Sequence, residues 1–350
     1  MSKPILFVGA GTEVVTQVML PACQAVFEHH QGQWPDDIYV WMADSDRRAQ
    51  NRYREAKLTK AQVIYTHLSI HQVRESLSRN PVAFKDVWQE GWTPLLQKAP
   101  DNGASALPVL GRLMLKAAGG TLVHQLEEFR RQMEVHDAGA PDIFVVLNPL
   151  AGTSRGSVFE LPRYLRALWP AATIHALVIY PLGLARLDRQ RANIFKTNFI
   201  EALRVLNHHA NPRPFEVYLD PQVGWEQREG QLIDNLMVFD GRYGNQRLKQ
   251  LEVREHQLDQ GLADIFGQAQ DFLAGVAMHD RLTDTILSRL ADVTVQRSRA
   301  EVAGQNTHCH ALHQTRMAID TEAFRKALIE RGIQRVLASF VTPGPDQNPS

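Results

Sequence analysis

The stretch IFVVLNPLAGTSRGS, residues 143–157, decides the fold. Its first five residues, Ile143–Leu147, form a short β-branched and aromatic run without a polar position, which predicts a strand buried on both faces. The residues Asn148–Gly152 are typical of a turn, and a helix is expected from about Ser157 to Trp169. A buried strand, a turn and a helix in this order form the unit from which parallel sheets are built.

The same unit recurs on both sides of this stretch. Further strands are predicted at Pro4–Val8, Ile38–Met42, Ile174–Tyr180 and Leu236–Phe239, and a weaker one at Val63–Thr66. Helices are predicted from Thr12 onward and at Leu107–Ala118, Glu127–Val135 and Leu187–Asn207. Strands that alternate with helices indicate an α/β fold, here a Rossmann-like, mostly parallel sheet covered by helices on both faces.

The domain organisation follows from the spacing of these patterns. The sheet domain is expected over residues 1–257, and a long central helix over 258–290. A reduced C-terminal α+β unit is expected over 291–340, with a helix around Thr321–Leu337. The tail at 341–350 is rich in proline and polar residues, which predicts disorder.

Composition excludes several classes of function. The 350 residues contain 38 Lys+Arg and 38 Asp+Glu, and this balance argues against a polycation that binds nucleic acid. The apolar runs are too short to span a bilayer, so no membrane insertion is expected. Only Cys23 and Cys309 occur, which excludes a disulfide framework and favours a reducing, cytoplasmic location. The cluster His308-Cys309-His310 has metal-ligand residue types but no evident partner pair, so a polar strand or an exposed turn is the favoured interpretation.

Three glycine-containing turns are candidates for binding an anion. They are Gly9–Thr12, Asp101–Ala106 before Gly111-Arg112, and Ala151–Ser157. Small residues let the backbone approach a phosphate, and a helix that follows offers free N–H groups. Because open parallel sheets bind ligands beyond the carboxyl ends of their strands, the turns are expected to meet at one edge.

The first turn alone also leaves a nicotinamide-dependent oxidoreductase open as an alternative. A dinucleotide-binding motif requires a third glycine and an acidic residue about 20 positions further on. Here Val14 occupies the glycine position, and Asp44 lies much further along the chain, which weakens this alternative.

The order of these motifs resembles the tubulin/FtsZ superfamily of GTP-binding cytoskeletal proteins, in particular its divergent bacterial tubulin-like branch. The matching stretches are Phe7–Gly11, Ala43–Ala49, Asn102–Ser105 with Gly111-Arg112, Ala151–Gly156 and Ile265–Leu273. The resemblance covers about residues 4–280. It implies that residues 1–257 form a GTP-binding domain, with GTP or GDP as ligand and Mg²⁺ as a companion ion.

The resemblance also implies individual roles. The nucleotide-binding residues would be Gly9, Ala10, Gly11, Thr12, Asp44, Asp46, Asn102, Gly103, Ala104, Gly152, Thr153, Ser154, Arg155, Gly156, Arg191, Asp240, Phe266 and Gln270. Phe266 would stack on the base and Gln270 would bond its edge, while Asp44 or Asp46 would help to hold Mg²⁺. Asp280 and Asp284 are the candidate catalytic acids, which would act on a neighbouring subunit's nucleotide after self-association.

Several positions depart from the family pattern. Ala151 and Ser154 replace glycines, and Arg155 replaces a small residue. An arginine in a phosphate loop could pair with a phosphate oxygen, or its bulk could fill the site. Glu13 stands where the family commonly has Asn, and the acidic Asn-x-Asp-x-x-Asp pattern is absent. A weak or assembly-dependent GTPase is therefore one expectation, and the alternative is a degenerate scaffold that has lost the ligand and binds a protein partner.

Overall fold

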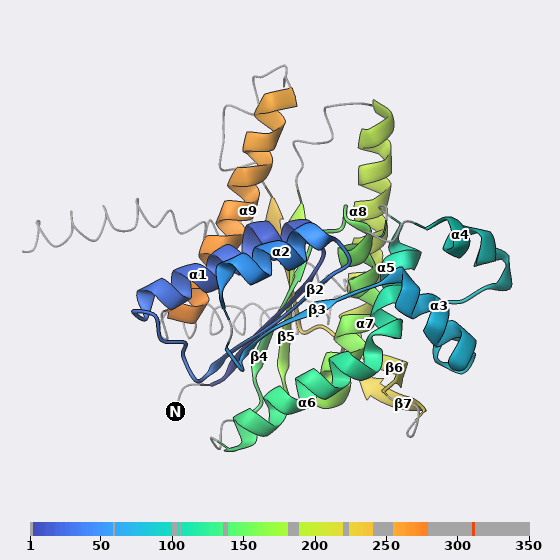
Figure 1. Ribbon diagram of the computed structural model, residues 1–350, viewed down its shortest axis with the longest axis horizontal. Helices are drawn as coiled ribbons and strands as arrows, with labels where there is room; N and C mark the ends of the chain where they lie inside the picture. The colour runs from blue at the N-terminus through green and yellow to red at the C-terminus, as the bar shows by residue number, and fades with distance from the viewer. Residues whose placement is uncertain are drawn as a thin grey trace, which may run out of the picture.

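The computed structural model describes residues 3–58, 60–99, 104, 107–135, 139–180, 189–219, 224–240, 255–278 and 310–311. Its main sheet contains β1 (Ile5–Ala10), β2 (Ile38–Asp44), β3 (Val63–His67), β4 (Asp142–Leu147), β5 (Thr173–Tyr180), β8 (Asn235–Asp240) and β9 (His310–Ala311). The strand order is β3-β2-β1-β4-β5-β8-β9, and every neighbouring pair is parallel. The predicted α/β fold with a parallel sheet is confirmed (Figure 1). All six predicted strands are present, including the weaker one at Val63–Thr66.

Helices cover both faces of this sheet. The helices and helical turns are η1 (Val14–Met19), α1 (Leu20–His29), α2 (Arg47–Ala56), α3 (Ile70–Arg79), η2 (Pro81–Phe84), η3 (Glu90–Trp92), α4 (Thr93–Lys98), α5 (Pro108–Ala117), α6 (Gly119–Val135), α7 (Gly152–Leu168), α8 (Arg189–His209) and α9 (Glu255–Met278). The hairpin of β6 (Arg213–Tyr218) and β7 (Trp225–Gly230) forms a separate antiparallel pair. None of these described helices is long and apolar enough to cross a membrane.

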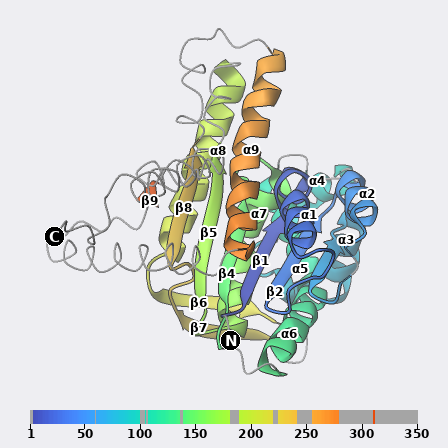
Figure 2. The ribbon, with the colours of Figure 1, turned by 90° about the vertical axis from the view of Figure 1, so that its left-hand side faces the viewer.

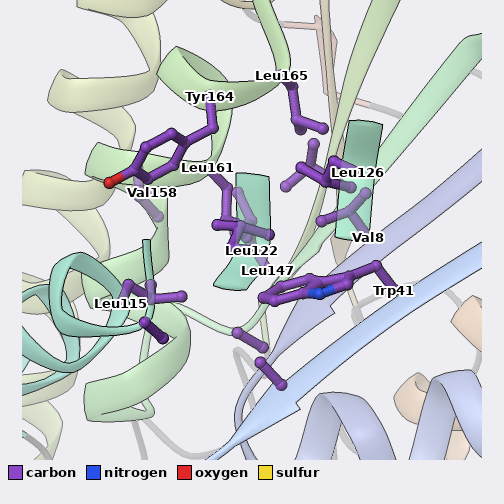
Figure 3. Close-up of a cluster of buried hydrophobic side chains, with 14 of the residues drawn as sticks. Val8, Trp41, Leu115, Leu122, Leu126, Leu147, Val158, Leu161, Tyr164 and Leu165 are labelled. Carbon is purple, nitrogen blue, oxygen red and sulfur yellow. The ribbon is translucent and has the colours of Figure 1, made fainter. Parts of the chain in front are cut away.

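Alternate residues of β1 enter two different hydrophobic cores, as expected for a strand buried on both faces. Ile5 and Phe7 face the core that η1, α1 and α9 cover. Figure 2 shows α9 running alongside α1 over this face. Leu6 and Val8 face the opposite core, where α5, α6 and α7 supply most of the helical side chains. In Figure 3, Val8 lies beside Trp41 among leucines of these helices.

Three helix boundaries differ from the sequence predictions. Helix α7 begins at Gly152 rather than near Ser157, because its first turn packs directly against α5. Helix α6 begins at Gly119, earlier than the predicted Glu127. Helix α9 is described from Glu255 to Met278, and the rest of the predicted central helix lies outside the described residues. The predicted C-terminal unit and tail lie outside them as well, apart from β9.

Helices α5 and α7 touch through their backbones. A Cβ atom built on Gly156 of α7 would lie 2.3 Å from the backbone nitrogen of Arg112 and 2.6 Å from the carbonyl carbon of Gly111. A Cβ on Gly111 would lie 2.3 Å from the carbonyl oxygen of Gly152. Real Cβ atoms do not come this close to backbone atoms, so neither glycine can gain a side chain unless the helices separate. This contact fixes where α7 begins at the carboxyl edge of the sheet.

We therefore expect Gly156→Ala to lower the free energy of unfolding by about 2 kcal/mol, since the added methyl group meets backbone rather than flexible side chains. Gly120→Ala in α6 is the matched control, because its Cβ would meet nothing within 4 Å. This control is expected to be neutral or to gain up to ~1 kcal/mol from the better helix propensity of alanine. Urea unfolding of both variants measures the difference, and equal stabilities would contradict the close helix contact.

Candidate functional site

The turn after β1 brings the chain against the first turn of α7. Gly11 has φ +107°, a conformation that L side chains rarely adopt, and its N–H donates to the carbonyl of Ala43 at 2.9 Å. A Cβ at Gly11 would lie 3.0 Å from the Cβ of Ser154. Glycine is therefore needed both for the turn and for the approach, while Gly9 and Ala10 form the end of β1.

The end of β2 joins the same place through a buried carboxyl group. The hydroxyl of Thr12 donates to Oδ2 of Asp44 at 2.6 Å, and Asp44 is only 1% exposed. Burial raises the pKa of Asp44 to about 6, although bonds from Thr12 and from the backbone N–H groups of Ser45 and Asp46 oppose the shift. The carboxyl group of Asp44 is thus buried from solvent at the carboxyl edge of the sheet.

The first turn of α7 completes the arrangement. The hydroxyls of Ser45 and Thr153 lie 3.3 Å apart, which links the end of β2 to the start of α7. The hydroxyl of Ser154 accepts from the N–H of Asn148 at 2.8 Å. The first helical hydrogen bond runs from the N–H of Arg155 to the carbonyl of Ala151, so residues 152–154 have no acceptor within the helix. The side chain of Ala151 does not cap the helix. The N–H groups of residues 152–154 and the helix dipole therefore favour a bound anion.

We call the convergence of Gly11–Thr12, Asp44–Ser45 and Gly152–Ser154 the cradle. Strands β2, β1 and β4, which precede these turns, are neighbours in the sheet. Of the remaining predicted turn, Ala104 is buried and accepts a bond from the N–H of Leu107, whereas Asn102 and Gly103 lie outside the described residues. Helices α8 and α9 both project past this edge of the sheet (Figures 1 and 2).

Asp46 and Arg155 have local partners in the structure. Asp46 caps α2 by accepting from the N–H of Arg48 at 2.8 Å, and the guanidinium of Arg48 also donates to it. These hydrogen bonds lower the pKa of Asp46. Arg155 is half-buried near Glu201 of α8; burial lowers the pKa of Arg155, and the charge of Glu201 opposes that shift. The nucleotide roles expected for both residues stay predictions.

The two predicted base-binding residues lie on α9. Phe266 is 3% exposed and belongs to the core shared with η1 and α1, while Gln270, one helical turn later, is half-buried. Phe266 thus packs against protein in this structure, and its stacking on a base stays a prediction. The helix itself lies on the face of the sheet next to η1, which follows the cradle turn at Gly11–Thr12.

The other expected site residues are only partly described. Arg191 lies in the first turn of α8 and Asp240 ends β8 at the same edge of the sheet, but their side chains are outside the description. Asp280, Asp284, His308 and Cys309 lie outside the described residues altogether. Sequence reasoning missed Ser45 and Asn148. Their signal was their position directly after β2 and β4, where parallel strands place functional groups.

A metal ion at the cradle would need ligands besides protein. Within the part of the chain that the structure describes, no three His, Cys, Asp or Glu side chains gather as a metal site. Mg²⁺ is typically held by one or two carboxylates together with phosphate oxygens and water. Asp44 therefore fits a magnesium ion that arrives with a phosphate ligand.

Comparison with known proteins gives one family match and several similar solved structures. A family model described as "Tubulin like" matches residues 9–264. An FtsZ mutant from M. jannaschii is 12% identical, with coverage of 79% of this chain and 56% of that chain and a TM-score of 0.44. An FtsZ dimer from M. jannaschii is 15% identical, with coverage of 79% and 54% and a TM-score of 0.39. TubZ of Clostridium botulinum phage c-st is 12% identical, with coverage of 58% and 49% and a TM-score of 0.32.

The extent of these similarities is limited. The chain spans about half the length of the solved structures it matches. No curated protein matches the sequence significantly.

The raised pKa of Asp44 has a measurable consequence for stability. An unfolded aspartate has a pKa of about 3.9, so the folded chain binds more protons than the unfolded chain between that value and about 6. Stability should fall as pH rises through this window, because ionised Asp44 is disfavoured in the fold. Asn carries no charge, so Asp44→Asn is expected to be more stable by roughly 3 kcal/mol at pH 8, with the difference vanishing near pH 4.

Urea unfolding across this pH range tests the expectation. Asp46→Asn is the matched control, because the pKa of Asp46 is lowered and removal of its charge should not stabilise the protein at pH 8. A stability difference between Asp44→Asn and wild type that does not change with pH would contradict a buried ionised carboxylate.

Proposed function

The chain belongs to the tubulin-like family, and we propose that it binds a guanine nucleotide at the cradle and has a cytoskeletal or scaffolding role. The observation that carries the proposal is the convergence of three turns, Gly11–Thr12, Asp44–Ser45 and Gly152–Ser154, at the carboxyl edge of the sheet. Free N–H groups at the start of α7 suit the phosphates. Asp44 suits a magnesium ion that the phosphates share.

Hydrolysis, if it occurs, would be phosphoryl transfer to water, in which positioning and neutralisation of charge dominate. In this proposal the cradle holds the phosphates, and the water-orienting acid comes from a neighbouring subunit, with Asp280 and Asp284 as its candidates. GTPase activity would therefore be slow in the monomer and rise with protein concentration. Self-association is part of the same proposal and rests on family membership.

Binding of GTP to the purified chain, measured by calorimetry with and without Mg²⁺, tests the proposal. We expect a Kd tighter than ~100 µM with Mg²⁺. Asp44→Asn should weaken binding about tenfold in Mg²⁺, because the metal contact is lost, and should leave binding in EDTA unchanged or tighter, because a negative charge beside the phosphates is removed. Asp46→Asn is the matched control, since asparagine caps a helix as well as aspartate does.

Wild-type affinity in Asp46→Asn would assign the magnesium contact to Asp44. The absence of binding at high micromolar GTP would contradict the proposed function. An Asp44→Asn variant that loses affinity equally in Mg²⁺ and in EDTA would contradict the metal role but not the nucleotide site.

The second candidate function is a scaffold that kept the fold but lost the ligand, and Arg155 is the observation that favours it. Its half-buried side chain belongs to the first turns of α7, four residues after Ala151 in the predicted phosphate loop. If the guanidinium binds a phosphate, Arg155→Ala should weaken GTP binding about tenfold. Tighter binding by this variant would show that arginine fills the site, and no binding by either protein would support the scaffold.

A further inference from the structure

A polar cavity lies away from the cradle, beside the carboxyl half of α7. It is bounded by α7, the end of α8 and the β6–β7 hairpin, with a volume of about 200 Å³. One water molecule needs only ~10–15 Å³ of such space, so the cavity has room for a larger polar group. Arg163, His208 and Arg213 line it, together with Asp86 and Glu216.

A buried network of charges adjoins this cavity. Asp86 is bound by Lys116 at 2.9 Å, by Arg163 at 3.1 Å and by Arg112. Glu160 pairs with Arg112 and lies 3.3 Å from Lys116. The side chains of Lys116 and Glu160 are 2% and 3% exposed, so most of this charge is held away from water. Three cations face two carboxylates in the network.

The positive charges exceed the negative ones when the cavity wall and the adjoining network are counted together. The only other carboxylate that lines the cavity among the described residues, Glu216, is paired with Lys85 at 3.3 Å. The charged residues of the network and the cavity wall, together with Lys85 that pairs with Glu216 just outside the wall, are Lys85, Arg112, Lys116, Arg163 and Arg213 against Asp86, Glu160 and Glu216. Five cations therefore meet three carboxylates, which leaves an excess of two positive charges.

Two arginines next to the cavity also keep hydrogen-bonding capacity. The Nε–H of Arg163 is buried without an acceptor, although its NH1 donates to Asp86. Arg213 is exposed, and its NH1 bonds Nδ1 of His208 at 3.0 Å. That bond leaves Nε2 of His208 as the N–H donor of a neutral ring. A buried donor without an acceptor costs free energy, which an anion at this place would recover.

We propose that this cavity binds a small tetrahedral oxyanion with two negative charges, of which inorganic phosphate is the simplest. Its charge balances the excess of two cations, and its oxygens match the planar donor forks of Arg163 and Arg213. A carboxylate of an acidic molecule carries one charge and would leave half of the excess unbalanced. The site is separate from the cradle and does not depend on nucleotide binding.

Calorimetric titration of the full chain with inorganic phosphate at constant ionic strength tests this proposal. We expect phosphate to bind with a Kd of ~1 mM or tighter. Arg213→Gln should weaken this affinity about tenfold, because one charge-assisted hydrogen bond is lost. Arg163→Gln should weaken phosphate binding further, but this variant also disturbs the buried network. Arg213 is exposed, so its replacement does not threaten folding. Arg204→Gln removes an exposed arginine that pairs with Glu201 on α8, and it should bind phosphate as wild type does.

The same titration in saturating GTP separates the two sites. Phosphate binding that persists with GTP present supports the proposal, and binding that GTP abolishes would assign phosphate to the cradle and contradict it. If GTP does not bind at all, the comparison of Arg213→Gln with Arg204→Gln still decides. Equal affinity in these two variants, no binding at ~10 mM phosphate, or tighter binding of acetate than of phosphate would each overturn the proposal.

Discussion

The contact between the backbones of α5 and α7 is the constraint on which the rest of the structure depends. Gly111 and Gly156 let the two helices approach more closely than any side chain would allow. This approach sets the first turn of α7 beside Gly11, where the N–H groups that precede the helical ladder face the carboxyl edge. The candidate site is therefore a product of helix packing as much as of loop sequence.

The same edge carries a charge that the fold tolerates rather than uses for stability. Asp44 is buried, and its carboxylate is opposed by burial even with Thr12 as a hydrogen-bond donor. An uncharged residue would suit an empty site better. A divalent cation with its phosphates would reverse this balance, because a nearby positive charge favours the ionised form. The cost of burying Asp44 is thus a physical argument that supports the proposed ligand.

The sequence indicated the sheet well and the long-range contacts poorly. Ile143–Leu147 lies within β4 because an all-apolar run bounded by turns has few alternatives to a buried strand. The hairpin strand Trp225–Gly230 escaped notice, because its polar residues show no apolar run. The start of α7 at Gly152 and the network around Asp86 depend on contacts between segments far apart in the chain, which local periodicity does not reveal. Within the site, the meeting of the turn after β1 with the first turn of α7 followed from parallel topology, while the burial of Asp44 and Phe266 required the structure.

The central claim is that three turns form one anion-binding cradle. Hydrogen exchange of the full chain, with and without Mg²⁺ and GTP, tests this claim most directly. The account predicts that exchange slows together in residues 10–13, 44–46 and 151–155, since the three segments would contact one ligand. Nucleotide binding that leaves these three segments unchanged, or slows only one of them, would contradict it.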